Sequence, residues 1–318
     1  MSSVEGDLDN AAMHLMIPYA SAAGEAGAAA LQTLALPRLS ALLGLTQPDG
    51  APLGGDELSP DTPFELALRA AGQPVNAATM AAADGIQVDK HCWALVSPMH
   101  LSVSSDQVLA LDPQALQLGD ADSRRLLADL AAELFPASEG WRQAWGAADR
   151  WYVAHEDLQG LASASLERVI NRPVDAWMPE ARRLRTLQNE CQMLLHRHPL
   201  NAQREARGEL VVNSVWISGC GRFEPAQTEP GLQIERSLRG PLLAGDWAAW
   251  CDAWRSLDAG LINDMLTRAR QGQAGLSLTL CGDREARRYK VQQRSGWQRL
   301  WQSISPPSAD AAKILGAL

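Results

Sequence analysis

Two histidines that stand two residues apart are the first side chains here whose type and spacing could do chemistry. His196 and His198 flank Arg197 and precede Pro199. Such a pair can bind a metal when it lies on a strand, because alternate residues of a strand share one face. Here the pair follows a predicted helix, so we expect the rings to diverge and to cap the helix end. The pattern favours this structural role, and we predict no metal ligand in the chain.

A second candidate is the run Gly219-Cys220-Gly221, which directly follows a β-branched segment. Glycines in this position can bring main-chain N–H groups close to an anion. They can equally form a tight turn that only ends a strand, and the short motif favours this alternative. Cys220 lies between the glycines, where a thiol could be exposed as a nucleophile. Most single cysteines are buried and unreactive, so we give catalysis by Cys220 less weight.

Composition and motifs exclude several classes of protein. The 318 residues carry a net charge of −9 and include no recognisable nucleic-acid-binding motif, so we do not expect a nucleic-acid partner. Phosphate-loop, dinucleotide, serine-hydrolase and zinc-protease motifs are also missing from the sequence. No apolar run reaches the roughly 20 residues of a membrane span. The first ten residues are acidic, unlike a secretory leader, so we expect a cytoplasmic protein without a membrane partner.

Composition also indicates how the core is formed, where the surface charge lies and whether the cysteines are reduced. Apolar residues make up 46% of the chain, which is enough for a packed core. Residues 1–150 carry 19 acidic and 7 basic side chains, and residues 151–318 carry 18 and 21. The second half therefore holds the basic patches that an acidic or phosphorylated partner would need. The five cysteines are far apart and form no CxxC pair, so we expect reduced thiols.

Hydrophobic patterns predict the elements that position these residues. Apolar runs predict strands at residues 13–17, 92–96, 108–111, 210–218 and 276–281. Amphipathic runs predict helices at 22–45 with a break before Pro37, and at 121–134, 179–196, 246–257 and 259–269. The order strand, helices, strand over residues 210–281 is typical of a parallel crossover. We therefore expect an α/β fold: a mostly parallel sheet with helices on both faces, interrupted by an α+β insert.

Composition along the chain suggests where the parts begin. We predict a disordered tail at residues 1–12 and a discontinuous α/β core made of residues 13–84 and 177–318. Residues 85–176 contain strand-like runs, a helix and a tryptophan-rich segment, and are predicted to form the insert.

A family resemblance rests on the segment 188–221. The run Gln188–Leu195 leads to His198-Pro199-x-Asn201-x-x-Arg204, then to Asn213-Ser-Val-Trp and Gly219-x-Gly221. This order resembles the archaeal-type cofactor-independent phosphoglycerate mutases of the alkaline phosphatase superfamily. The whole chain is also similar to the RpfE-type regulatory proteins of proteobacteria, which are labelled phosphoglycerate-mutase-like. The resemblance implies an alkaline-phosphatase-like core.

The departures from that family are informative. Its active mutases use two divalent metals, held by Asp and His, and a serine nucleophile. The first strand should end in a metal-binding Asp, but here it ends Ile17-Pro18-Tyr19. The family's metal-binding histidines should follow the Gly-x-Gly turn, but no histidine follows His198. A two-metal site needs several ligands at fixed positions, so we expect neither the inherited phosphotransfer nor a cofactor.

The resemblance then implies a binding role without catalysis. The matching polar positions Asn201, Arg204 and Asn213 belong to the substrate side of the family's cleft, where Arg204 could clamp a phosphate or carboxylate. His198, Gly219 and Gly221 complete the set of candidate ligand-binding residues, although local structural roles compete for all of them. The leading hypothesis is a pseudoenzyme with a regulatory or ligand-sensing role, with a small phosphorylated or carboxylate ligand or a protein as its partner. The alternatives are a metal-dependent phosphomutase or phosphatase with a rebuilt site, for which Asp246 and Asp283 are candidates, and a plain protein-interaction module.

Overall fold

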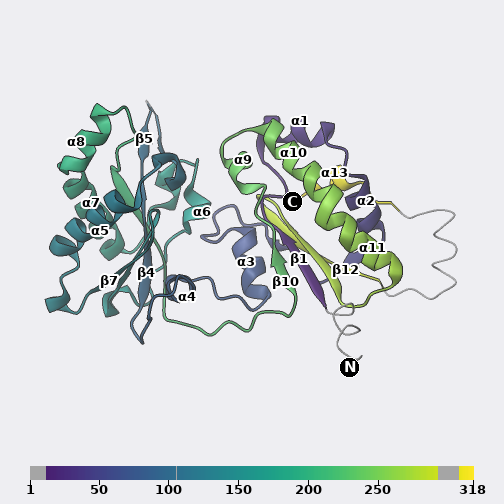
Figure 1. Cartoon of the computed structure of the whole chain (residues 1–318), viewed down its shortest axis with the longest axis horizontal. Helices are drawn as coiled ribbons and strands as arrows, with labels where there is room; N and C mark the ends of the chain where they lie inside the picture. The colour runs from purple at the N-terminus through teal and green to yellow at the C-terminus, as the bar shows by residue number, and fades with distance from the viewer. Residues whose placement is uncertain (1–11, 105, 293–307) are drawn as a thin grey trace, which may run out of the picture. The chain divides into compact units, whose positions relative to one another are not determined.

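The computed structural model describes residues 12–104, 106–292 and 308–318 (Figure 1). The predicted tail at residues 1–12 lies outside this range except for Ala12. The chain divides into two compact units. Unit 1 contains residues 1–57, 62–72 and 227–318, and unit 2 contains residues 58–61 and 73–226.

Unit 1 is built on one mixed sheet in the order β10-β1-β11-β12-β2, with β3 also paired to β12. Its strands are β1 (Met13–Ile17), β2 (Thr46–Pro48), β3 (Leu53–Gly54), β10 (Leu232–Ile234), β11 (Leu276–Cys281) and β12 (Glu285–Val291). Strand β1 runs parallel to β10 and to β11. Strand β12 is antiparallel to β11, β2 and β3. The α/β class is therefore confirmed, but the expectation of a mostly parallel sheet is wrong.

The length of one connection explains this correction. Only residues 282–284 separate β11 from β12. A parallel neighbour needs a crossover of a dozen residues or more, whereas a short turn can join only antiparallel neighbours. The predicted crossover between residues 210–218 and 276–281 is wrong for a related reason, because those two strands belong to different sheets.

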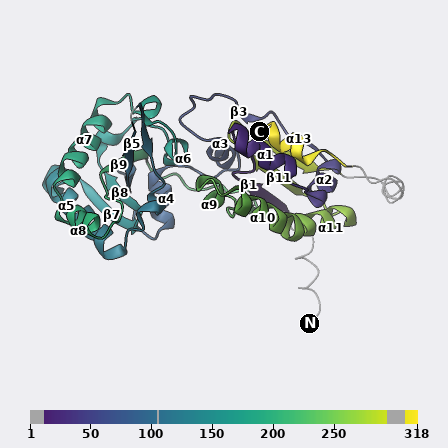
Figure 2. The same ribbon diagram turned by 90° about the horizontal axis from the view of Figure 1, so that it is seen from above.

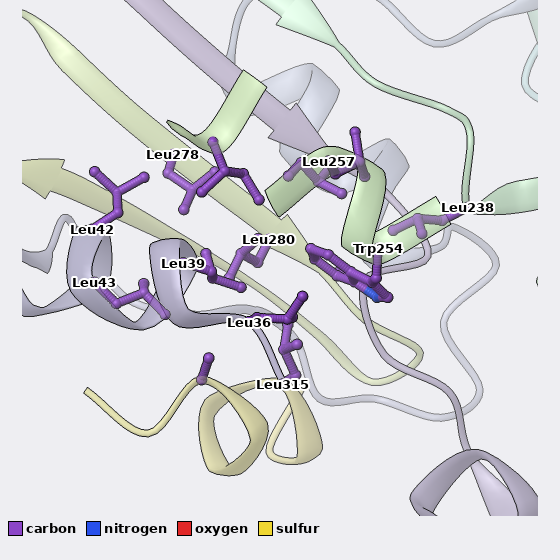
Figure 3. Close-up of a cluster of buried hydrophobic side chains, with 14 of the residues drawn as sticks. Leu36, Leu39, Leu42, Leu43, Leu238, Trp254, Leu257, Leu278, Leu280 and Leu315 are labelled. Carbon is purple, nitrogen blue, oxygen red and sulfur yellow. The ribbon is translucent and has the colours of Figure 1, made fainter. Parts of the chain in front are cut away.

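Helices cover both faces of the unit 1 sheet. They are α1 (Gly24–Thr33), α2 (Pro37–Gly44), α3 (Pro63–Ala70), α9 (Arg239–Leu243), α10 (Trp247–Leu257), α11 (Asn263–Gln271) and α13 (Ala311–Gly316). The alternating residues Leu276, Leu278 and Leu280 of β11 point into one apolar core with α1, α2, α10, α11 and α13 (Figure 3). Helix α3 contacts β3, β11 and β12 outside this core. It therefore packs on the opposite face.

The helix pairs of unit 1 follow the predicted breaks. Pro37 stands at the first turn of α2, where its missing N–H costs no hydrogen bond. The two predicted helices at 246–269 are joined through a π turn at Asp258–Ile262. That turn places the buried Asp258 carboxylate against the start of α2, where it accepts from the main-chain N–H groups of Leu39 at 2.7 Å and Arg38 at 3.3 Å. A carboxylate at a helix N-terminus satisfies otherwise unpaired N–H groups.

Unit 2 contains a purely antiparallel sheet in the order β7-β8-β4-β9 and a two-stranded sheet β5-β6. The strands are β4 (Trp93–Met99), β5 (Leu101–Val103), β6 (Val108–Ala110), β7 (Arg142–Ala147), β8 (Arg150–Ala154) and β9 (Ser214–Gly221). The helices are α4 (Ala77–Ala83), α5 (Asp120–Leu134), α6 (Leu166–Val169), α7 (Arg182–His196) and α8 (Pro199–Ala206). Figure 2 shows α5, α7 and α8 on one side of the larger sheet and α4 on the other, which agrees with the two apolar clusters.

The division into units differs from the expected boundaries. The sequence pattern assigns residues 177–226 to the α/β core, but β9 pairs antiparallel with β4 along most of its length. Helix α7 packs on β9 and shares its apolar cluster. Strand pairing of this kind links segments that are more than a hundred residues apart, and no periodicity in the sequence reveals it. Residues 73–84 also belong to unit 2, because α4 packs under β4.

Within the described residues, no single helix is long and apolar enough to cross a membrane. Helices α1 and α2 pass that test only when joined, and they are bent by 87° relative to each other.

Candidate functional site

The motif segment 198–221 forms a structural brace inside unit 2. Asn201 is buried, and its side-chain amide donates to the carbonyl oxygens of Leu195 at 2.8 Å and Val212 at 2.7 Å. Its Oδ1 accepts from the N–H of Val212 at 2.9 Å. These three bonds tie the end of α7 to the segment that enters β9. The amide of Asn201 is thus occupied by main-chain groups.

Arg204 is the most deeply buried of the predicted ligand-binding residues, with a relative exposure of 1%. Its Nε donates to the carbonyl oxygen of Leu210 at 2.8 Å, and Nη2 donates to that of Leu116. Nη1 lies 3.3 Å from the carboxylate of Glu209. The guanidinium therefore joins three segments of unit 2 and points at main-chain oxygens. We interpret it as a packed structural cation.

The remaining predicted residues also make local contacts. Asn213 pairs with both main-chain groups of Leu101, at 2.7 and 2.9 Å. His198 caps the start of α8 through Nδ1, which accepts from Leu200, and its Nε2 lies 2.9 Å from Asp129. Because Nδ1 accepts, the proton of a neutral ring sits on Nε2. His198 therefore caps the start of α8, and not the end of α7 as the sequence had predicted. His196, at the end of α7, is exposed.

The prediction that Gly219 and Gly221 form a turn is wrong, because both lie within β9, where they let the strand approach α4. A Cβ at Gly219, where φ is +64°, would lie 3.2 Å from the main-chain nitrogen of Ala77. A Cβ at Gly221 would lie 3.0 Å from Asn76, which caps α4. Glycine is needed here for close packing and for the left-handed backbone. Burial raises the pKa of the intervening Cys220 thiol to about 12, so this thiol is protonated at neutral pH.

Strands β1 and β11 meet at the edge where parallel α/β sheets hold ligands, beyond the carboxyl ends of their strands. At this edge β1 is followed by Pro18 and by Tyr19, whose φ of 58° is left-handed. The indole of Trp250 donates to the carbonyl oxygen of Tyr19 at 3.2 Å. The N–H of Ala20 donates to the carbonyl oxygen of Cys281 at 2.9 Å, which links the two strand ends. These bonds hold an otherwise costly turn.

Leu318 fills the other side of the same edge. Its side chain is buried, and its main-chain oxygen accepts from the N–H groups of Arg284 at 2.8 Å and Glu285 at 2.7 Å. A Cβ at Gly282 would lie 2.5 Å from that of Leu318, so the chain is packed without space between them. The edge where a substrate would bind is therefore occupied by an indole, a leucine and main-chain bonds.

The two predicted acidic candidates lie at separate elements of unit 1. Asp246 caps α10, with its carboxylate accepting from the N–H of Ala249 at 2.9 Å. Asp283 is half-buried in the turn between β11 and β12. In the described part of the chain, no group of three or more His, Cys, Asp or Glu side chains is placed to hold a metal ion.

A polar cluster that sequence reasoning missed lies on the α3-covered face of the same sheet. His14 is buried, with its Nε2 2.8 Å from the Thr279 hydroxyl and its Nδ1 3.1 Å from the Glu229 carboxylate. Arg288 donates to both oxygens of Glu229 and contacts Asp49 at 3.3 Å. The Thr279 hydroxyl, the His14 imidazole and the Glu229 carboxylate are thus linked in the same sequence as the nucleophile, base and orienting acid of a catalytic triad.

Burial limits what this cluster can do. Thr279 is only 3% exposed, which leaves no surface on which a substrate could meet its hydroxyl. Desolvation, followed by the charge of Arg288, lowers the pKa of His14, so the ring is neutral near pH 7. The hydrogen bond from Arg288 lowers the pKa of Glu229, and this effect is larger than that of burial, which raises it. The period-two alternation in β11 could have indicated a polar face, but Glu229 and Arg288 could not be assigned to it from sequence.

Comparison with known proteins adds a distant likeness. No protein-family model matches the chain, and no curated protein matches it. A cofactor-independent phosphoglycerate mutase from Thermoplasma acidophilum is 14% identical, with a TM-score of 0.37, over 89% of this chain and 91% of that one. The PH0037 protein from Pyrococcus horikoshii is 12% identical, with a TM-score of 0.46, over 96% of this chain and 92% of that one. Both TM-scores are below 0.5, and both identities are too low to transfer a function.

Proposed function

We propose that this protein is a pseudoenzyme that acts through binding, in a ligand-sensing or regulatory role, and does not transfer phosphoryl groups. The observation that carries the proposal is the filled edge of the unit 1 sheet. Trp250 and Leu318 occupy the ends of β1 and β11, where a catalytic α/β protein would present polar side chains. Transition-state stabilisation needs charged or dipolar groups aimed at the reacting atoms. Here the ends of β1 and β11 are instead packed against an indole, a leucine side chain and main-chain hydrogen bonds.

The motif segment supports the same proposal. In the resemblance described above, Asn201 and Arg204 lie on the substrate side of a cleft. Here each uses its polar atoms on main-chain groups at 2.7–2.9 Å or on a neighbouring carboxylate. A side chain whose donors are occupied and buried cannot bind a phosphate without breaking those bonds. The segment therefore stabilises unit 2.

The test is an activity and metal measurement on the purified full chain. The protein is incubated with Mn²⁺ or Zn²⁺, freed of excess metal and analysed by mass spectrometry. It is then assayed for phosphoglycerate mutation and for hydrolysis of p-nitrophenyl phosphate. We expect no stoichiometric metal and no turnover above the buffer rate.

Two aspartates provide the matched control for that assay. Asp246 caps α10, whereas Asp252 lies on the exposed surface of the same helix. About two metals per chain, together with turnover that Asp246→Asn abolishes and Asp252→Asn preserves, would establish the rebuilt enzyme and refute the pseudoenzyme. Turnover that both variants retain would also refute it, and would place the chemistry elsewhere in the chain.

A further inference from the structure

Unit 2 contains a hollow of about 690 Å³ beside the end of α5, away from the motif segment. It lies within the range of volumes typical of small-molecule sites, about 300–1,000 Å³. Its wall is made of small, aromatic and polar side chains from α5, from the segment 135–144 and from the segment that precedes β4. The lining residues are Ile86, Gln87, Trp93, Ala128, Ala131, Ala132, Phe135, Pro136, Ala137, Trp141, Arg142, Gln143 and Ala144.

Small side chains keep the hollow open. Ala128 and Ala132 stand four residues apart on α5, so they share one face of the helix, and both are exposed. Ala137 and Ala144 line other parts of the wall. A surface helix usually places long polar side chains at such positions. Two exposed alanines on one face therefore leave space that a ligand can fill.

The aromatic part of the wall is held in place before any ligand binds. Phe135 and Trp141 pack with ring centroids 5.0 Å apart. Trp141 also stacks on His155 at 4.4 Å, with the two ring planes only 16° apart. Phe135 and Trp141 are each only 3% exposed, so these rings form a rigid backing to the hollow.

An exposed cation gives the hollow a chemical preference. Arg142 is 54% exposed, and among the described residues its ion pair is with Asp89, which His91 also contacts at 2.7 Å. The ion pair with Asp89 uses Nη1 of Arg142, so the N–H groups on its other guanidinium nitrogens can meet an anion.

We propose that this hollow binds a small aromatic anion, with its ring against the exposed alanines of α5 and its anionic group at Arg142. The hollow would provide the binding role proposed above for the protein. Its test does not depend on that proposal, because it measures binding in unit 2 without any assay of phosphoryl transfer.

The test uses two fluorescent probes that differ by one charge. The aromatic sulfonate 8-anilinonaphthalene-1-sulfonate carries the anionic group, and N-phenyl-1-naphthylamine is its neutral counterpart. Ala132→Leu fills the hollow, and Arg142→Gln removes the cation. Ala121→Leu is the matched control, because Ala121 is exposed on the same helix and does not line the hollow. Near-ultraviolet circular dichroism checks that each variant is folded.

We expect one probe molecule per chain, a Kd at least tenfold higher for both probes in Ala132→Leu, and no change in Ala121→Leu. In Arg142→Gln the Kd should rise for the sulfonate alone. Unchanged binding in Ala132→Leu, or equal weakening in Ala121→Leu, would overturn the site. Equal binding of the sulfonate to wild type and Arg142→Gln would overturn its preference for anions. If Ala132→Leu is not folded, Ala128→Leu fills the same hollow and decides the same question.

Discussion

Replacement of Asn201 by Asp tests whether the motif segment is a structural brace. The change preserves the shape of the side chain, so it leaves no cavity. It removes both donors, and the carbonyl oxygens of Leu195 and Val212 lose their bonds at 2.8 and 2.7 Å. Each buried group left without a partner costs about 1–3 kcal/mol. The new carboxylate is also held against two carbonyl oxygens without a cation. We expect unit 2 to lose roughly 3–5 kcal/mol of unfolding free energy at pH 7.

Urea unfolding followed by fluorescence and circular dichroism measures this loss. Gln203→Glu is the matched control, because it makes the same amide-to-carboxylate change at an exposed position of the same helix. We expect it to stay within about 0.5 kcal/mol of wild type. Burial would raise the pKa of the carboxyl group that Asn201→Asp introduces, so this variant should regain part of its stability as the pH falls toward about 4. A loss below about 1 kcal/mol in Asn201→Asp, or an equal loss in both variants, would refute the brace.

Three further predictions concern other features of the chain. His14 has a lowered pKa in the folded state, so its contribution to stability is complete above about pH 6.5 and is lost as the pH falls below that value. Between pH 7.5 and 5.5, wild type should lose about 1 kcal/mol more unfolding free energy than His14→Gln, and parallel pH profiles would contradict this. Gly72→Ala should destabilise unit 1 by about 2–4 kcal/mol, because φ is +76° and the new Cβ would overlap the carbonyl oxygen of Gln227. Gly50 is the control, because it has a similar φ of +86° but open space around it, and Gly50→Ala should cost only about 1 kcal/mol. Thermal unfolding measures both losses, and equal losses in Gly72→Ala and Gly50→Ala would show that the overlap at Gly72 is relieved. Burial raises the pKa of the Cys220 thiol to about 12, so this thiol should react with iodoacetamide at pH 7.5 far more slowly in the folded protein than in urea. Peptide mass spectrometry measures the two rates, and equal rates would contradict the burial of the thiol.

Local patterns in the sequence predicted the longer helices and five of the described strands. The strand at residues 276–281 and the break before Pro37 are each confirmed within a residue or two. These features depend on neighbours in the chain, and steric and capping preferences act over one or two turns. The same patterns established that the chain is an α/β protein. They also predicted an α+β insert at residues 85–176, whereas unit 2 contains residues 58–61 and 73–226.

Only the tertiary structure decided which polar side chains have their hydrogen-bonding groups taken up by partners inside the protein. Arg204 and Asn201 have the residue types of a phosphate or carboxylate site, and nothing local distinguishes that role from a buried brace. The difference lies in partners such as Leu116, which is 88 residues from Arg204 in the chain. His14 and Glu229 are separated by 215 residues and meet because β1 and β10 are neighbours in one sheet.

The hollow beside α5 also arises from contacts between segments that are distant in the sequence. Its wall combines segments that lie up to 58 residues apart in the sequence, from Ile86 to Ala144. Whether Ala132 faces open space or a packed neighbour depends on how α5 is rotated against β7. The sequence by itself determined the amphipathic character of that helix, because its period of 3.6 residues is local. The burial, the partners and the empty volume arise only when distant segments pack, because these quantities depend on contacts across the fold.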